Sequence, residues 1–340
     1  MPKELLLTGP RQIQIVSYDE RELEPGDVQA DAIVSGLSHG TELALYRGDT
    51  AFGGKRFDPD LRLFLEDAET QPYPMRLGYE WVGRVAAVGA DVRGLDAGDL
   101  VHLTLPHRET QTVAAPLLVL PTTLDPERAA LLQSTAIALQ AVHDARITVA
   151  DRVAIFGLGV FGLLAVQLAR LSGAGWVAAV DPIAGRRELA RSFGADWTLD
   201  SESSDVGREI KLAAGGGADV AIEFSGRYEA LQEALRCVRL AGSVVAAGFY
   251  VGAGGALRLG EEFHHNRLTL VGSMSGWGAP QRQQGWDRDR LRATALDLLA
   301  QDRLDVAAFI THRVPFERAA EAYELVDRRP EETLRVVLTY

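Results

Sequence analysis

A short apolar run that ends in a glycine-rich turn constrains the fold of this chain more than any other feature. The run ends at Phe156, and the turn that follows, Gly157-Leu158-Gly159-Val160-Phe161-Gly162, has a Gly-x-Gly-x-x-Gly pattern. A helical pattern then covers 163–171, and a second apolar run, 176–180, ends at Asp181. This order of strand, glycine turn, helix, strand and acid is typical of a dinucleotide-binding unit.

Each glycine of the turn has its own physical role in such a unit. Gly157 permits the tight turn, Gly159 lets the backbone approach a pyrophosphate, and Gly162 lets the helix pack closely against the strand. The start of the helix, at Val160 and Phe161, offers amide donors and the positive end of a dipole to the phosphates. We therefore predict that these residues contact a dinucleotide cofactor.

The acid at the end of the second strand bears on which dinucleotide binds. A carboxylate at this position accepts hydrogen bonds from the adenosine ribose and repels a 2′-phosphate, so Asp181 favours NAD over NADP. Arg186 and Arg187 follow it closely in the sequence and could instead pair with a phosphate. The alternative interpretation of Asp181 is an ordinary loop acid after a strand. We expect NAD to be the cofactor and NADP to be the less favoured one.

The length and the charge of the chain limit its organisation and its partners. At 340 residues it exceeds the usual size of one core, so two domains are expected. The net charge of −12 argues against binding to nucleic acid or to an anionic membrane. There is no secretory signal pattern and no apolar run of membrane length, and the single cysteine, Cys237, is expected to be a core residue. We expect a cytoplasmic protein whose partner is a small-molecule substrate.

The pattern of apolar runs and turn residues divides the chain into two kinds of structure. Residues 1–123 contain short runs separated by turns, which predicts a β-rich domain. Residues 124–302 alternate helices and strands, which predicts an α/β domain with a doubly wound parallel sheet. The segment 303–340 ends in a predicted strand that returns to the first domain. With this arrangement, the cleft between the domains is the expected place for an active site.

Four motifs carry a resemblance to a known superfamily. They are Gly40-Thr41-Glu42, Gly78-Tyr79-Glu80-Trp81-Val82-Gly83, the glycine turn, and Arg191 to Asp196. They resemble motifs of the medium-chain dehydrogenases/reductases, which include zinc alcohol dehydrogenases and zinc-free quinone reductases. The resemblance spans essentially the whole chain and implies a GroES-like β-rich domain with a Rossmann dinucleotide-binding domain. Within the superfamily, residues 38–48 are most similar to the bacteriochlorophyllide a dehydrogenase-like subgroup.

The same resemblance implies that the zinc ligands have been lost. His39 stands where the zinc members have a cysteine ligand, Tyr79 replaces a histidine, and Leu131 occupies the third ligand position. Leucine cannot bind a metal, a neutral tyrosine is a poor zinc ligand, and one cysteine cannot form a four-cysteine site. We therefore expect no zinc. One alternative stays open, a site built from His39, Glu80 and either His264 or His265.

Without zinc, side chains must handle the proton, and the resemblance points to four candidates. Thr41 matches the relay hydroxyl of the family, and His39 could act as a general acid/base because histidine titrates near neutrality. Tyr79 could donate a hydrogen bond to a developing oxyanion. Glu80 would need a partner such as an arginine, or it would be protonated if buried. In the alternative interpretation, His39 caps a helix or fills the core, and Tyr79 fills the space of the metal.

Further candidate contacts lie at the ends of predicted strands. Ser225, Gly248 and Ser273 match strand-end turns that pass the cofactor in the family. The loop from Gly276 to Gly285, with Trp277 and Trp286 at its ends, could cover a substrate or form an interface.

Three functional hypotheses follow. The first is a zinc-independent oxidoreductase that transfers a hydride between NAD(H) and a secondary alcohol or ketone, with a polyol, a sugar derivative or a similar compound as substrate. The second is an NADPH-dependent quinone or enone reductase, which loss of the zinc ligands supports and Asp181 opposes. The third is a non-catalytic NAD(H)-binding protein. By analogy with the superfamily, we expect a homodimer that pairs through 268–272.

Overall fold

The computed structural model describes residues 1–49, 53–67, 73–274 and 285–340, which form two compact units. The first unit comprises Met1–Leu131 and Ile310–Tyr340, and the second comprises Leu132–Phe309. None of the helices within these described ranges is long and apolar enough to cross a membrane.

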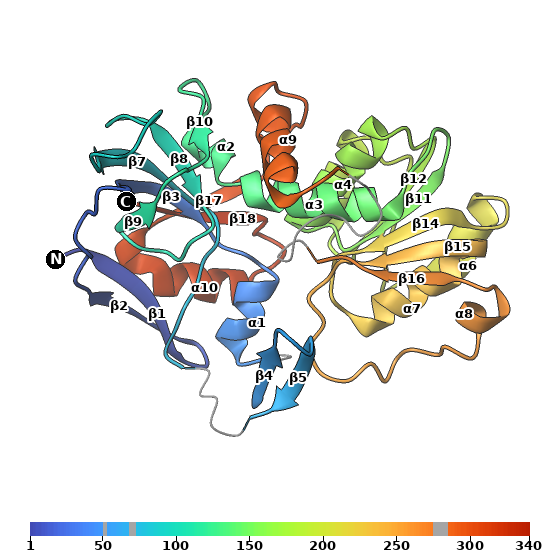
Figure 1. The fold of residues 1–340 in the computed structure, drawn as a ribbon. Helices are drawn as coiled ribbons and strands as arrows, with labels where there is room; N and C mark the ends of the chain where they lie inside the picture. The colour runs from blue at the N-terminus through green and yellow to red at the C-terminus, as the bar shows by residue number, and fades with distance from the viewer. Residues whose placement is uncertain (50–52, 68–72, 275–284) are drawn as a thin grey trace. The chain divides into compact units, whose positions relative to one another are not determined.

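The second unit is built on a six-stranded parallel sheet with helices on both faces (Figure 1). In spatial order its strands are β13 (Trp197–Leu199), β12 (Trp176–Val180), β11 (Arg152–Phe156), β14 (Ala218–Glu223), β15 (Val238–Ala246) and β16 (Thr269–Gly272). All neighbours are parallel, and the order reverses between β11 and β14. This is the strand order of a doubly wound dinucleotide-binding sheet, so the predicted α/β class is confirmed.

Most helices of this unit pack against the sheet, whereas α8 packs on α7 and α9 packs on α3. They are α3 (Leu132–Ala145), α4 (Val160–Leu171), α5 (Ala184–Ser192), α6 (Val206–Ala213), α7 (Tyr228–Cys237), α8 (Glu262–His265) and α9 (Arg288–Ala300). Helices α3 and α4 pack together, and α6 and α7 pack together against the face that carries Ala154 and Phe156. Cys237 ends α7, is fully buried and belongs to this core, as expected. Burial raises the pKa of its thiol, which makes it a poor nucleophile.

The first unit is a β-rich structure of folded sheets. Its largest sheet has the order β10 (Val119–Leu120), β8 (Leu100–Leu103), β7 (Trp81–Val88), β3 (Asp27–Gly36), β18 (Arg335–Thr339) and β17 (Ile310–Pro315), with β9 (Thr110–Ala114) also paired to β3. A smaller sheet contains β2 (Gln12–Ser17), β1 (Lys3–Gly9) and β6 (Met75–Arg76). The helices are α1 (Thr41–Arg47), α2 (Pro126–Ala129) and α10 (Ala319–Arg328). The predicted return of the last strand is confirmed, because β18 pairs with β3.

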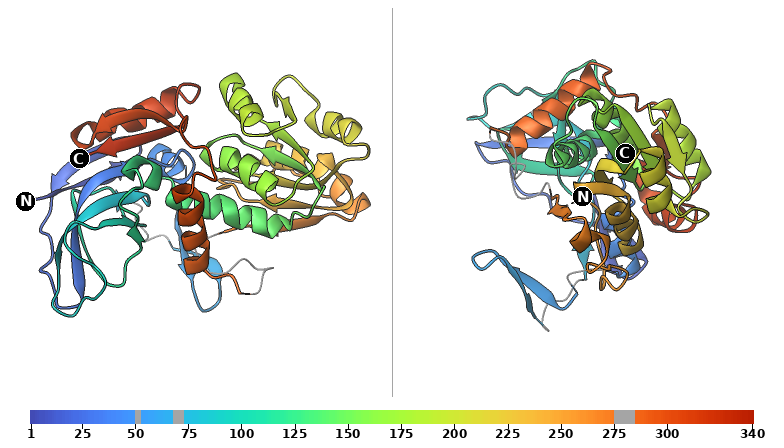
Figure 2. Two further views of the ribbon diagram at one scale, coloured as in Figure 1. Left: turned by 90° about the horizontal axis from the view of Figure 1, so that it is seen from above. Right: turned by 90° about the vertical axis from the view of Figure 1, so that its right-hand side faces the viewer.

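A hairpin occupies part of the segment between residues 50 and 74. Strands β4 (Lys55–Asp58) and β5 (Leu63–Glu66) form a two-stranded sheet of their own, which projects from the first unit (Figure 2).

The borders between the units lie a few residues from the predicted ones, for local reasons. Helix α2, predicted to belong to the second domain, packs on β3 and β7 of the first unit, and its Glu127 pairs with Arg313 of β17 at 2.5 Å. Residues 303–309, predicted to belong to the first domain, are part of the second. The side-chain amide of Gln167 bonds both the backbone nitrogen and the carbonyl of Asp305 there.

Candidate active site

The glycine turn lies at the carboxyl end of β11 and leads directly into α4. Gly157 has a φ of +81°, a left-handed conformation that glycine adopts without strain. A side chain at Gly162 would collide with the carbonyl oxygen of Gly157, whereas one at Gly159 would meet open space. The amides of Val160 and Phe161 begin α4, where backbone N–H groups lack partners within the helix. The turn therefore has the open, donor-rich form that suits a phosphate group.

Asp181, at the carboxyl end of β12, holds this turn in place. Its Oδ2 accepts a hydrogen bond of 2.7 Å from the Leu158 amide, and its Oδ1 accepts one of 2.8 Å from the Ile183 amide. Nη1 of Arg186 lies 3.9 Å from the same carboxylate, and Arg187 donates to the Asp181 carbonyl at 2.7 Å. A carboxylate has about four acceptor positions, so capacity remains for a ribose. Asp181 thus fixes the glycine turn, and its role toward a ribose stays a prediction.

A cavity of about 180 Å³ lies beside Asp181 and the glycine turn. Its wall includes Gly157 and Ser225, and its charged residues are four acids and one arginine. These are Asp181, Glu202, Glu229, Glu233 and Arg227. Glu233 is paired with Arg236 at 2.7 Å and Glu229 lies 3.9 Å from Arg227, so Asp181 and Glu202 contribute most of the potential that disfavours an added phosphate and accepts an uncharged ribose. Sequence reasoning identified only Asp181 among these acids, because nothing in the local sequence of the other three marks them.

The other predicted cofactor contacts lie along the same edge of the sheet. Gly248 follows β15, and a Cβ there would lie 2.9 Å from Oε2 of Glu223. Ser273 follows β16, and its amide donates to the Ala246 carbonyl at 2.9 Å. The structure thus brings Gly157, Asp181 and Ser225 to one cavity and places Gly248 and Ser273 at neighbouring strand ends.

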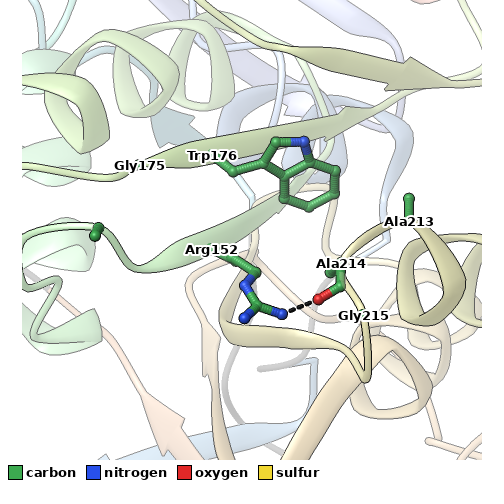
Figure 3. A pocket seen from close by; sticks show the side chains of 7 residues that line it. Arg152, Gly175, Trp176, Ala213, Ala214 and Gly215 are labelled. Atoms are coloured by element: carbon green, nitrogen blue, oxygen red, sulfur yellow. Dashed lines mark hydrogen bonds between the residues drawn. The ribbon is translucent and has the colours of Figure 1, made fainter.

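A larger and more open hollow, of about 540 Å³, lies at the other end of the strands (Figure 3). Arg152, which begins β11, and Trp176, which begins β12, line it, and the Arg152 guanidinium donates to the Ala214 carbonyl. Ligands of doubly wound sheets bind at the carboxyl ends of the strands. The smaller cavity beside the glycine turn is therefore the candidate cofactor site.

In the first unit, the turn before α1 gathers the candidate proton-transfer groups. His39 and Thr41 are half-buried and flank Gly40, the N-cap residue of α1. The Tyr79 hydroxyl donates to Ser38 Oγ at 2.7 Å, which joins Tyr79 to this turn. Burial raises the pKa of Tyr79, so the phenol stays protonated at neutral pH and is suited to donate a hydrogen bond.

Glu80 is wholly buried, and it has the arginine partner that such an acid requires. Its Oε2 lies 2.9 Å from Nε2 of His102, and its Oε1 lies 3.8 Å from Nη2 of Arg335 on β18. Arg335 is also buried and donates to the Leu37 carbonyl at 2.7 Å. Because Glu80 has no exposed surface, its position suits a role in holding its neighbours rather than contact with a substrate.

A second buried acid, Glu42, fixes the turn before α1. Its Oε1 accepts a hydrogen bond of 3.0 Å from the Ser38 amide, and its Oε2 lies 3.1 Å from Nε2 of His107. Tyr323 of α10 donates to the same oxygen at 2.5 Å, and Nδ1 of His107 lies 2.7 Å from Ser35 Oγ. His102 and His107 both lie in the β-rich part, and sequence reasoning missed them because their partners are distant along the chain.

The residues at the three positions that the resemblance assigns to zinc ligands do not fit zinc. Leu131 is fully buried and has no donor atom, and the Tyr79 hydroxyl is engaged with Ser38, so His39 is the only conventional ligand. Across the described ranges, no group of three His, Cys, Asp or Glu side chains is placed to hold a metal. His264 and His265, the residues of the alternative site, are exposed on α8 in the second unit.

The loop that could cover a substrate is described only at its end. Trp277 lies outside the described residues. The Trp286 ring lies 4.3 Å from that of His143, and the Arg290 guanidinium lies 4.1 Å from the Trp286 ring centroid. Burial, together with Arg290, lowers the pKa of His143, so this contact involves a neutral imidazole at neutral pH.

Comparisons with known proteins agree with these two units. Residues 51–114 match the alcohol dehydrogenase GroES-like domain, and residues 160–290 match the zinc-binding dehydrogenase family. The chain is 32% identical to D-guloside 3-dehydrogenase of Escherichia coli K12, over 99% of this chain and 100% of that protein.

Two solved structures share the fold. A dehydrogenase of Sinorhizobium meliloti 1021 bound to NADP has a TM-score of 0.79 and 23% identity, over 100% of this chain and 99% of that one. An alcohol dehydrogenase of Escherichia coli CFT073 complexed with NADH has a TM-score of 0.80 and 20% identity, with the same coverage. The fold, the motifs and the full-length relative together show that this chain belongs to the alcohol dehydrogenase-like family of medium-chain dehydrogenases/reductases.

Proposed function

We propose that this enzyme is a zinc-independent dehydrogenase that uses NAD(H) to oxidise a secondary alcohol, with a polyol or a sugar derivative as the substrate class. The relative that is 32% identical is named for a sugar derivative, D-guloside, which supports this class. Residues 38–48 resemble the bacteriochlorophyllide a dehydrogenase-like subgroup, and this resemblance supports membership in that subgroup. The subgroup is varied, and its name does not fix a substrate.

One observation carries the choice of NAD. Asp181 lies where it can accept hydrogen bonds from a ribose, and the cavity beside it carries the further acids Glu202, Glu229 and Glu233. A 2′-phosphate would be repelled by these carboxylates. The fold alone does not decide between the cofactors, because its solved neighbours include one bound to NADP and one complexed with NADH.

Proton handling is proposed to fall to side chains of the first unit. Bound NAD would accept a hydride from the alcohol carbon at its nicotinamide ring. The Tyr79 hydroxyl would exchange its hydrogen bond to Ser38 Oγ for one to the substrate oxygen, and Thr41 and His39 would carry the alcohol proton away. Glu80 and Arg335 would hold the strand ends that carry Tyr79. The lack of a zinc ligand set at His39, Tyr79 and Leu131 supports a reaction without that metal.

We also propose a homodimer that pairs through β16. This strand is an edge of the six-stranded sheet, so its outer backbone groups can pair with those of a second copy. Its exposed Leu270 supports such a contact. Sedimentation of the wild type and of Leu270→Lys tests this proposal, and an unchanged molar mass in the variant would argue against it.

The experiment that tests the proposed function is a fluorescence titration with NADH and with NADPH, followed by NAD-linked assays on polyols and glycosides. Tighter binding of NADH together with oxidation of a secondary alcohol would support the proposal. Tighter binding of NADPH together with reduction of a quinone or enone would replace it with the second hypothesis. Binding of NADH without turnover of any of these compounds would favour a non-catalytic protein.

A further inference from the structure

Glu223, the last residue of β14, is a buried acid that none of the roles above requires. It has no exposed surface, and its carboxyl group accepts four hydrogen bonds. Oε1 accepts from the Ser225 amide at 2.6 Å and from the Ser225 hydroxyl. Oε2 accepts from the Gly226 amide at 3.1 Å and from the Tyr250 hydroxyl at 2.5 Å. These bonds occupy the acceptor positions of the carboxyl group almost completely.

The turn that Glu223 holds is packed against the glycine turn of the cofactor cavity. A Cβ at Gly157 would lie 2.7 Å from the Ser225 nitrogen, so the two backbones approach as closely as glycine allows. The Phe224 amide also donates to the Phe156 carbonyl at 2.9 Å. Any movement of the turn at Ser225 would therefore change the shape of the cavity that Gly157 and Ser225 both line.

Glu223 also ties this turn to the end of the next strand. Tyr250 lies four residues beyond β15, and its hydroxyl bond to Glu223 spans the two strand ends. A Cβ at Gly248 would lie 2.9 Å from Glu223 Oε2. The chain after β15 can therefore pass this close to the carboxyl group only because residue 248 is glycine. Glu223 thus joins the turn after β14, whose backbone packs against the end of β11, to the segment after β15.

We propose that Glu223 is a positioning residue for the dinucleotide, acting through the Ser225–Gly226 turn and Tyr250. Its carboxyl group keeps the wall of the cavity in its binding form before the cofactor arrives, so less ordering is required on binding. This inference rests on the proposed NAD(H) function, because it assigns the cavity to that cofactor.

The chemistry of the site requires a carboxyl group and not merely a polar side chain. Each oxygen of Glu223 faces one backbone amide and one hydroxyl. In Glu223→Gln, the side-chain NH₂ group replaces one of the two carboxyl oxygens. Both oxygens accept from a backbone amide, so in either orientation the NH₂ group faces an N–H donor and one amide loses its acceptor. Tyr250→Phe removes one donor and leaves the ring contact with Tyr228, at 5.2 Å, in place.

A matched control lies on the same strand. Asp219, near the amino end of β14, accepts a hydrogen bond from the Arg152 amide at 2.8 Å and pairs with Arg239 at 2.5 Å. It resembles Glu223 in anchoring a neighbouring strand, but it lies at the end of the sheet away from the glycine turn. Asp219→Asn is therefore expected to lower thermal stability and to leave cofactor affinity unchanged.

The test measures the dissociation constant for NADH by fluorescence, together with the melting temperature, for the wild type, Glu223→Gln, Tyr250→Phe and Asp219→Asn. We expect the dissociation constant to rise about tenfold in Glu223→Gln and about threefold in Tyr250→Phe, which corresponds to partial loss of charge-assisted hydrogen bonds. Unchanged affinity in Asp219→Asn, despite a lower melting temperature, would support a role specific to the cofactor.

The outcomes separate this inference from the proposed function. A wild type that binds neither NADH nor NADPH would remove the proposed function and the inference with it. A wild type that binds NADH, with Glu223→Gln and Tyr250→Phe binding equally well, would overturn the inference alone. An equal loss of affinity in Asp219→Asn would also overturn it, because general destabilisation would then be the cause. If Glu223→Gln does not fold, the comparison of Tyr250→Phe with Asp219→Asn decides.

Discussion

The replacement of Asp181 by alanine tests the link between the glycine turn and the choice of cofactor. The variant loses two hydrogen bonds, of 2.7 Å from the buried Leu158 amide and 2.8 Å from the half-buried Ile183 amide, to a carboxylate that is only 5% exposed. Hydrogen bonds to charged groups contribute about 1.5–3 kcal/mol each. We therefore expect the free energy of unfolding to fall by at least about 3 kcal/mol.

The same variant should show a weaker preference for NADH over NADPH. The lost bonds to the ribose correspond to about 1.5–3 kcal/mol, or about 10- to 100-fold in NADH affinity, whereas NADPH affinity changes less because repulsion is relieved. The preference should fall without being inverted, since Glu202, Glu229 and Glu233 remain in the cavity. The assay is a fluorescence titration with both cofactors, combined with urea unfolding.

Asp196→Ala is the matched control for this prediction. Asp196 accepts a hydrogen bond of 2.7 Å from the Val177 amide near the start of β12 and pairs with Arg170, at the end of the strand opposite to Asp181. This variant should also lose stability, with an unchanged ratio of NADH to NADPH affinity. A ratio that is unchanged in Asp181→Ala, or that falls equally in both variants, would refute the assigned role of Asp181.

The remaining predictions concern a buried ion pair, the metal and pH. Arg335→Leu leaves the buried Glu80 without its arginine and should cost about 3–5 kcal/mol in urea unfolding. Loss of the exposed Arg313, as Arg313→Leu, should cost much less because solvent screens its ion pair, and equal costs would contradict this reasoning. Dialysis against a chelator should leave the dehydrogenase rate unchanged, and metal analysis that finds about one zinc per chain would refute a zinc-free site. Burial raises the pKa of Glu223 above its ordinary value of 4.5, so its contribution to stability is complete below pH 4.5 and declines as pH rises through the raised pKa. The stability difference between wild type and Glu223→Gln should therefore shrink over this range, and a difference that grows with pH would contradict the assignment.

Local patterns predicted most of the second unit correctly. The strand before Gly157, the helix after it and the acid at 181 occupy consecutive positions, and the structure places them as predicted. Helix limits were less accurate. The apolar pattern of 228–240 predicts one helix, but α7 ends at Cys237, immediately before β15. The pattern of 129–145 also predicts one helix, but Ala129 ends α2 and α3 begins only at Leu132. Pairing of β15 with β14 ends the first helix, and packing of α2 on β3 and β7 of the first unit separates α2 from α3. Such tertiary contacts are not present in a local pattern.

The site of the first unit depended far more on tertiary structure. The motif at Gly40-Thr41-Glu42 marked the right turn, but nothing in it indicated that Glu42 meets His107 and Tyr323, which lie 65 and 281 residues away along the chain. Similarly, the partner of Glu80 is Arg335, from the last strand of the chain. Buried charges need partners, so the sequence predicts that a partner exists, while only the fold selects which one.

The sequence by itself determined the class of this protein, because hydrophobic periodicity and a glycine turn act over a few neighbouring residues. It also determined the chemical type at each key position, such as the leucine at 131, where the resemblance implies a metal ligand in zinc members. The tertiary structure decided which groups meet, including the acids that share a cavity with Asp181 and the four donors that converge on Glu223. These contacts join residues that are distant along the chain, and they form only when strands align in one sheet and bury their ends together.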